Sequence, residues 1–173
     1  MPVKIINAGI SGGNAVHGLE RLERDVLRHQ PDLTVVCFGL NDSGNGVEGI
    51  SKYMDALEGI FAKLKEAGSE IIFMTPNMMN TYVSVSLTDV YIREVAERIG
   101  QTQLDGTLDK YLEAAIAVCE KCGVKVCDCY AKWKRLQKNG VDTTSLLANY
   151  INHPTREMNW LFAVSLIDAI LDE

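Results

Sequence analysis

A histidine on a stiff turn, an asparagine and a glycine-rich turn are the residues of this sequence whose types could carry out chemistry. His153 precedes Pro154 in "NYINHP". Proline fixes its own φ and biases the preceding residue away from helix, so the imidazole is presented at a fixed place. Asn41 lies in "FGLND" and Gly12 in "NAGISGG". Side-chain amides and backbone N–H groups stabilise negative charge, and imidazole is the commonest general base, so these residues indicate chemistry at a carbonyl group.

An imidazole that acts as a base needs a group to deprotonate, and two serines lie beside the other candidate residues. Ser11 precedes Gly12, and Ser43 follows "FGLND". A serine nucleophile must come within roughly 2.6–3.2 Å of its base. Each hydroxyl also suits a local role, because turn serines bond to the backbone around them. In the same way "FGLND" fits an Asx turn, so Ser11 and Ser43 are only candidate nucleophiles.

Four short apolar runs, rich in β-branched residues, predict the strands that must position these groups. They cover residues 3–8, 33–39, 70–75 and 124–129. They show little alternation, which is typical of strands covered on both faces. Apolar residues at helical spacing predict helices over residues 15–29, 51–67, 105–122 and 156–172. The alternation of strands and helices predicts an α/β fold, a three-layer α/β/α sandwich with a mostly parallel sheet, as one domain over residues 1–173.

The loops that follow the predicted strands are rich in glycine, asparagine and small polar residues. In an open parallel sheet, ligands bind beyond the carboxyl ends of the strands. "GISGGNA", "LNDSGNG", "PNMMNTY" and the loop ending in "INHP" occupy that position. The two methionines of the third loop suit either an apolar pocket or ordinary loop packing. Gly68 and Gly123 each stand where a helix must stop before the next strand.

Composition excludes several classes of partner. The 173 residues carry a net charge of −6, and the pI is near 5.1, which argues against nucleic acid or an anionic membrane. No apolar run approaches the roughly 20 residues of a membrane span, and the start does not resemble a signal peptide, so we expect a cytoplasmic protein. "GNGVEG" matches a dinucleotide fingerprint only formally, because it does not open directly off a strand. We expect no cofactor and a small-molecule ligand.

Four of the five cysteines are clustered in "CEKCGVKVCDC", which covers residues 119–129. CxxC is a common zinc-ligand spacing. However, the first pair continues the apolar face of a predicted helix and Cys127 lies in a predicted strand. Free cysteine is often a small buried hydrophobe. We therefore favour core packing and expect no metal.

The three motifs together resemble blocks of the SGNH or GDSL hydrolase family, whose members are esterases, lipases, acetyl-carbohydrate esterases and thioesterases. "INAGISGG" is similar to the second block of that family, "FGLND" to the third and "NYINHP" to the fifth. The resemblance covers nearly the whole chain. It implies that Gly12 and Asn41 belong to an oxyanion hole and that His153 is the catalytic base. It also implies a flavodoxin-like sheet with the strand order 2-1-3-4-5.

Two departures from the family pattern bear on activity. The first block of the family, Gly-Asp-Ser, supplies the nucleophile and precedes the second block. In this sequence the second block already begins at residue 7, and no Gly-Asp-Ser occurs elsewhere. The acid expected three residues before the histidine is replaced by Tyr150, with Asn149 one position further back. Asn149 could orient the imidazole, but it cannot stabilise an imidazolium as a carboxylate would.

These departures lead to two functional expectations and one structural expectation. The chain is an SGNH-type serine ester hydrolase whose activity is impaired because the nucleophile block is absent. The alternative is a non-catalytic module that binds a small ligand on the same scaffold. The missing first strand would lie between residues 3–8 and 33–39, and its loss leaves unpaired edges. We expect that another chain supplies this strand, that residues 3–8 pair directly with residues 33–39, or that the edge drives homo-oligomerisation.

Overall fold

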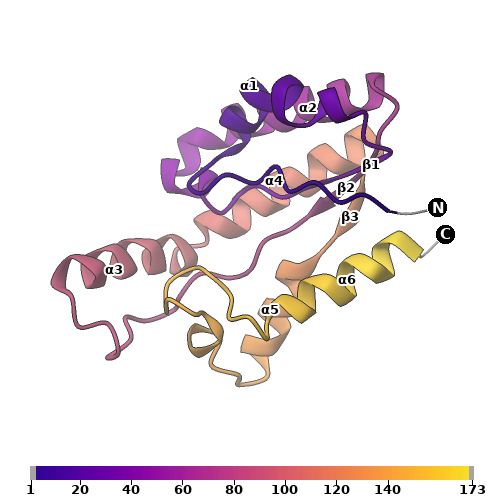
Figure 1. The fold of residues 1–173 in the computed structure, drawn as a ribbon. Coiled ribbons are helices and arrows are strands. Elements are labelled where there is room, and N and C mark those ends of the chain that lie inside the picture. Colours follow the sequence, from indigo (N-terminus) through magenta and orange to yellow (C-terminus); the bar gives the residue numbers. More distant parts are fainter. Residues whose placement is uncertain (1–2, 172–173) are drawn as a thin grey trace.

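The computed structural model describes residues 3–171 and places a parallel sheet between layers of helices (Figure 1). The strands are β1 (Leu33–Val36), β2 (Glu70–Met74) and β3 (Lys125–Cys127). Their order is β1-β2-β3, and both pairings are parallel. The predicted α/β class and the parallel sheet are therefore confirmed. The strands end slightly earlier than the apolar runs suggested, so the last residues of each run begin the loops.

Six helices surround the sheet within the described residues. They are α1 (Ala15–Asp25), α2 (Ile50–Glu66), α3 (Val90–Leu104), α4 (Thr107–Cys122), α5 (Cys129–Lys138) and α6 (Asn159–Leu171). Four of them, α1, α2, α4 and α6, are the helices that the periodicity predicts. Helices α3 and α5 were not predicted, although each begins at an aspartate cap. Asp89 accepts from the N–H of Ile92, and Asp128 accepts from the N–H of Ala131.

One face of the sheet carries the main core. Val36 and Phe73 are buried there beneath α1, α2 and α4. On the opposite face, Ile72 and Cys127 are buried beneath α6. A third apolar cluster lies beyond the carboxyl ends of the strands, and it includes Leu147 from the segment that leads to His153. The helices of the two layers thus enclose the sheet, with α6 in the lower layer of Figure 1.

The strand predicted for residues 3–8 is not present. This segment is extended but belongs to no ladder, and Val3 and Ile5 are 87% and 89% exposed. Within residues 3–171, β1 pairs with β2 alone, and no hydrogen bond between main-chain groups joins β1 to residues 3–8. The expectation of direct pairing between these two segments is therefore wrong. The physical reason is that an apolar run becomes a strand only when a neighbour satisfies its backbone groups.

The cysteines are free thiols, and most of them belong to the core. Cys119, Cys127 and Cys129 are buried, and the last two sulfur atoms lie 3.8 Å apart. In the part of the chain that the structure describes, no cluster of three His, Cys, Asp or Glu residues is arranged to hold a metal ion. None of the helices within residues 3–171 is both long and apolar enough to cross a membrane.

Candidate active site

The loops of Gly12 and Asn41 lie against each other at the carboxyl end of β1. Asn41 Nδ2 donates a hydrogen bond of 2.8 Å to the Gly13 carbonyl. Gly12 has a φ of +71°, which glycine adopts without steric cost. A Cβ atom added at Gly12 would meet no heavy atom within 4 Å, so the turn is open to a ligand. The structure thus brings together the two residues predicted for an oxyanion hole.

Asp42, the residue after Asn41, is buried and holds the Gly12 and Asn41 loops in place. Its Oδ1 accepts 2.8 Å from the N–H of Ala15, and its Oδ2 accepts 2.9 Å from the N–H of Gly39. One carboxylate therefore ties the first turn of α1 to the loop after β1. The side chain is buried, and burial raises its pKa above the ordinary value, although the two backbone N–H groups oppose that shift.

The two candidate nucleophiles lie in different environments. Ser43 is buried, and its hydroxyl donates 2.9 Å to the Leu40 carbonyl, which is the local role that turn serines commonly take. Ser11 is exposed, and its hydroxyl forms no hydrogen bond with another residue of the range 3–171. Neither hydroxyl forms a hydrogen bond with His153 in the described chain. The serines therefore remain predictions as nucleophiles, and Ser43 already has a structural partner.

The loop that carries His153 is organised by Asn149. Asn149 Oδ1 accepts from the backbone N–H groups of Ile151, Asn152 and His153 at 3.1, 3.0 and 3.0 Å. Its Nδ2 donates to Asn152 Oδ1 at 3.0 Å. The side chain predicted to orient the imidazole thus holds the main chain that leads up to it. The His153 side chain is exposed, and its ring makes no hydrogen bond with any residue that the structure describes.

Contacts to the loop after β2 fix the position of the His153 loop. The N–H of Asn80 donates 2.7 Å to the Ile151 carbonyl, and Asn77 Nδ2 donates 2.8 Å to the Asn152 carbonyl. Met78 and Met79, between those asparagines, are buried in the same apolar cluster as Leu147. Of the two roles open to these methionines, the structure therefore shows packing. The His153 loop and the Asn41 loop both lie at the carboxyl end of the sheet.

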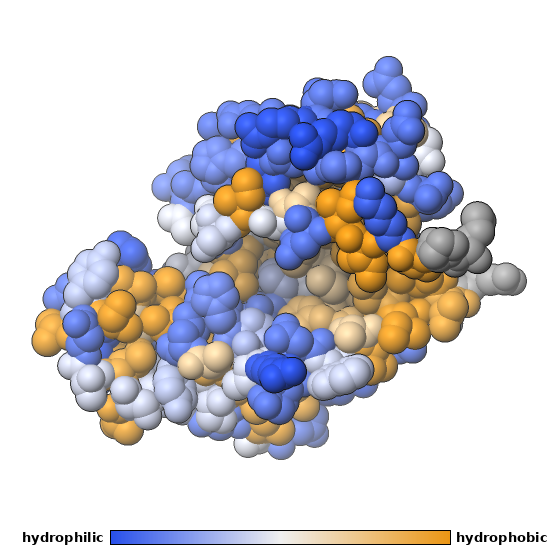
Figure 2. All heavy atoms as spheres, viewed as in Figure 1, coloured by the Kyte–Doolittle hydropathy of each residue, from blue (hydrophilic) through white to orange (hydrophobic). Residues whose placement is uncertain are grey.

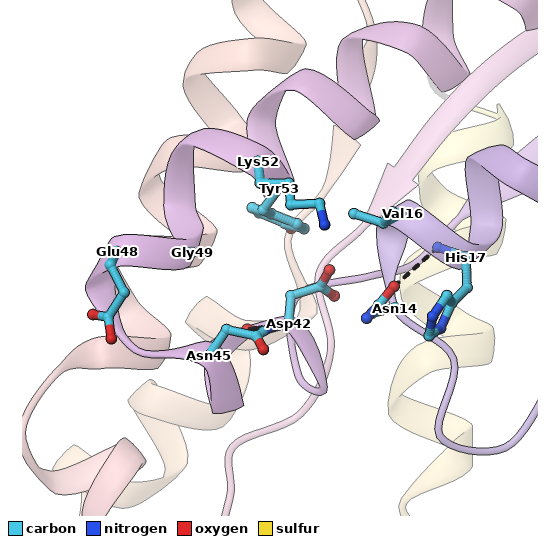
Figure 3. A pocket seen from close by; sticks show the side chains of 9 residues that line it. All are labelled: Asn14, Val16, His17, Asp42, Asn45, Glu48, Gly49, Lys52 and Tyr53. Carbon is cyan, nitrogen blue, oxygen red and sulfur yellow. Dashed lines mark hydrogen bonds between the residues drawn. The ribbon is translucent and has the colours of Figure 1, made fainter.

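A cavity of about 310 Å³ lies next to Asp42, between α1 and α2 (Figure 3). Asp42 lies near its centre in this view, and Asn14 caps α1 by accepting 2.9 Å from the N–H of His17. Most of the residues that line it have polar side chains, and they are Asn14, Val16, His17, Asp42, Asn45, Glu48, Gly49, Lys52 and Tyr53. The sequence analysis did not predict this cavity, because its residues come from two separate stretches, 14–17 and 42–53. The sequence contains one indication of this cavity. Asn14 directly follows the glycine turn, and Asp42 directly follows Asn41.

Comparisons with known proteins add the following findings. The family model described as "GDSL-like Lipase/Acylhydrolase family" matches residues 1–161. No curated protein sequence matches the chain. The structure is similar to that of Axe2, an acetylxylan esterase from Geobacillus stearothermophilus, with a TM-score of 0.70 and 21% identity over 95% of this chain and 71% of that chain. It is also similar to the acetyl xylan esterase AlAXEase, with a TM-score of 0.73 and 19% identity over 94% of this chain and 79% of that chain.

Further structures similar to this one are described as catalytic mutants of the Geobacillus esterase. In these three proteins a serine, an aspartate or a histidine is replaced by alanine. They match this chain with 21% identity, a level at which the likeness shows the fold.

Proposed function

This chain belongs to the GDSL-like lipase/acylhydrolase family, and on that premise we propose that it is a carboxylic-ester hydrolase in which residues 1–173 supply the base and the oxyanion-binding groups and contain no Gly-Asp-Ser block. The observation that carries the proposal is the hydrogen bond from Asn41 to the Gly13 carbonyl. It holds an amide and a glycine turn at the same place, open to solvent, beyond the carboxyl end of β1.

In the proposed reaction, an ester carbonyl binds at the Gly12 turn. Asn41 Nδ2 carries two protons, and only one of them is used in the bond to Gly13. The second proton and the N–H of Gly12 would donate to the oxygen as negative charge develops on it. Such preorganised donors supply about 3–4 kcal/mol each in acyl-transfer enzymes. His153 would accept the proton of the attacking hydroxyl.

We infer that the isolated chain is a weak hydrolase. Neither Ser11 nor Ser43 forms a hydrogen bond with the imidazole, and Asn149 uses its side-chain oxygen on the loop backbone. Water is then the available nucleophile, with His153 as its base. Serine hydrolases that lose their triad retain a residual acceleration of roughly 10³–10⁴ over water, which comes from the oxyanion hole and substrate binding. In the Geobacillus esterase, the catalytic mutants replace a serine, an aspartate or a histidine. Of these three residue types, the proposed reaction relies only on a histidine, His153.

The second candidate function is ligand binding without cleavage. The observation that favours it is the cavity beside Asp42, whose mixed polar and apolar lining suits a small molecule such as an acetylated sugar. The two esterases of similar structure are described as acting on acetylated xylan, which makes such a ligand the natural first choice. Both functions would use the same loops, and they differ in whether the ester bond is broken.

Hydrolysis of p-nitrophenyl acetate by wild type and by His153→Ala tests the proposal. We expect slow turnover above the buffer rate, and a fall of about tenfold or more in His153→Ala, because general bases typically contribute at least 10²-fold in complete enzymes. His29→Ala is the matched control, since His29 is exposed on the short turn after α1. Equal rates in wild type and His153→Ala would overturn the proposal, and binding of the ester without turnover would favour the second candidate.

A further inference from the structure

We propose that Tyr82 and Tyr150 form a subsite that binds the face of a neutral sugar ring beside the His153 loop. Tyr82 lies on the loop after β2 and is 47% exposed. Tyr150 lies three residues before His153 and is half-buried. Tyrosine combines an apolar ring with a polar tip, so a fixed, accessible ring can cover the C–H face of a sugar. This inference deepens the proposed function, on which it rests only for the cleavage of the bound ester.

The backbone of Tyr150 indicates that its side chain has a use. Its φ is +55°, and it is one of two non-glycine residues with a positive φ within residues 3–171. In this turn the N–H groups of the next three residues all reach Asn149. Glycine or asparagine would adopt the left-handed conformation at little cost, whereas a bulky side chain is strained there. Strain that is kept in this way is typical of functional sites.

The Tyr82 ring is fixed at the surface from both of its ends. Its hydroxyl donates 2.7 Å to Asp142 Oδ2. Asp142 is held in turn, because its Oδ1 accepts from the N–H groups of Thr144 and Ser145 at 3.1 and 3.3 Å. The Tyr82 carbonyl accepts 3.0 Å from Asn80 Nδ2. A ring that is already ordered loses little conformational entropy when a ligand stacks on it.

The two tyrosines come from loops that contact each other. The loop after β2 runs beside the His153 loop, in the region between α3 and α6 (Figure 1). The N–H of Asn80 donates 2.7 Å to the carbonyl of Ile151, the residue after Tyr150. The hydrogen bond to Asp142 raises the pKa of Tyr82, and the Tyr150 phenol adds to this shift, so the two phenol groups lie near each other. One ligand can therefore contact both rings.

The short His153 loop keeps Tyr150 near the proposed base. The N–H of Ala148 donates 2.7 Å to the His153 carbonyl, so residues 148–153 form one closed turn. The Tyr150 hydroxyl forms no hydrogen bond with the residues that the structure describes, so its ring is the part that is open to a ligand. A sugar ring bound there would lie beside the loop of the imidazole that is proposed to act on its acetyl group.

The surroundings of the tyrosines favour a sugar over a purely apolar ring. The surface between α3 and α6 is mainly hydrophilic to intermediate in Figure 2. The exposed Asp142 accepts one hydrogen bond at Oδ2, and a carboxylate oxygen can accept about two, so a sugar hydroxyl can also donate to it. The net charge of −6 disfavours an anionic ligand. A neutral pyranose offers both a C–H face and hydroxyl donors.

Saturation-transfer NMR with a monoacetylated methyl β-xylopyranoside tests the subsite without relying on turnover. We expect saturation of the sugar ring protons by wild type and about tenfold weaker binding by Tyr150→Gly and by Tyr82→Ala. Glycine adopts a φ of +55° freely, so Tyr150→Gly should be at least as stable as wild type in thermal unfolding. Tyr150→Phe keeps the ring and should bind like wild type. Tyr91→Ala is the matched control, because Tyr91 is exposed on α3.

Hydrolysis separates binding by the Tyr150 ring from a role in holding the loop. We expect the preference for the acetylated xyloside over ethyl acetate, as a ratio of kcat/KM values, to fall about tenfold in Tyr150→Gly, because ethyl acetate has no ring. A disturbed His153 loop would slow both esters equally. An unchanged ratio would therefore overturn the subsite.

The outcomes also distinguish the subsite from the proposed function. Sugar binding that depends on Tyr82 and Tyr150, without hydrolysis, would support the subsite and contradict the proposed hydrolysis. Hydrolysis together with equal sugar binding by wild type and Tyr150→Gly would support the hydrolysis and overturn the subsite. Absence of sugar saturation by wild type, or saturation of phenyl acetate alone, would overturn the assignment of a sugar ring.

Discussion

At the scale of single residues, the candidate site is held together by side-chain oxygens that accept from backbone N–H groups. Asp42 joins α1 to the loop after β1. Asn149 accepts hydrogen bonds from three successive N–H groups, the last of which is that of His153. Asp42 directly follows Asn41 in the sequence, and Asn149 lies four residues before His153. A carboxylate or an amide at these positions would also suit catalysis. The structure shows that their side-chain oxygens instead bind backbone N–H groups and hold the loops in place.

Asn149→Ala should destabilise the protein and loosen the His153 loop. The substitution leaves three backbone donors without their acceptor, and a lost hydrogen-bond partner of this kind costs about 1–3 kcal/mol. Asn149→Asp keeps the accepting oxygens and loses only the bond to Asn152, so its loss should be clearly smaller. Urea unfolding of both variants measures the difference. Equal stability of Asn149→Ala and wild type would contradict the role given to this side chain.

Asp42 should give the stability of the protein an unusual dependence on pH. Burial raises the pKa of its carboxyl above the ordinary value of 3.8. Just above that value the native state therefore binds a proton that the unfolded chain has lost, and stability falls as pH rises through the raised pKa. Asp42→Asn removes this titration. The stability difference between wild type and Asp42→Asn should thus shrink as pH rises above about 4.

Urea unfolding of both proteins at several values of pH measures that trend. Asp25 provides the comparison of opposite sign, because bonds to Arg24 hold its pKa below the ordinary value. Its contribution should be present above pH 3.8 and be lost as pH falls. If the stability difference between wild type and Asp42→Asn grows with pH, folding favours the ionised carboxylate, and the raised pKa of Asp42 is contradicted.

At the scale of elements, apolar periodicity predicted most of the helices. It did not predict α3 and α5, and it predicted a strand over residues 3–8 that is absent. α1, α2 and α4 follow the predicted ranges because their apolar residues repeat at helical spacing, whereas α6 lies in its predicted range although it is apolar on most sides. α3 has a weaker pattern, with Tyr91 and Leu104 exposed at its two ends. The strand pattern of residues 3–8 is as clear as that of β1. A strand needs a partner, however, and the sequence pattern of one segment does not show whether the partner is present.

Two glycines inside helices should respond in opposite ways to alanine. A Cβ atom at Gly18 in α1 would overlap the Phe38 ring, which is a rigid neighbour. A Cβ atom at Gly59 in α2 would come within 2.9 Å of Leu19 Cδ2, the end of a flexible side chain. Alanine favours a helix by about 1 kcal/mol over glycine. Thermal unfolding should show a loss of about 1–3 kcal/mol for Gly18→Ala and little loss or a gain for Gly59→Ala.

At the scale of the whole molecule, the two faces of the sheet are covered unequally. Three helices bury one face, whereas α6 alone covers the other and leaves β1 open. The candidate site lies at the end of this open edge. The sequence motifs predicted which loops would carry it, and the structure brings the Gly12 and Asn41 loops into contact. The cavity beside Asp42, and the bond from Ala15 to Asp42, depend on contacts between segments that no single motif encodes, whereas the bonds of Asn149 and Ser43 stay within their own loops.

This unequal covering predicts how stability is distributed along the chain. β2 is paired on both sides, so the amides of residues 71–73 should be among the slowest to exchange with deuterium. The amides of residues 3–7 have no backbone acceptor in the described chain and should exchange within seconds. Hydrogen-exchange mass spectrometry at several protein concentrations measures both. Slow exchange of residues 3–7 at every concentration would mean that they pair within their own chain, and slow exchange only at high concentration would mean that a second copy supplies the partner.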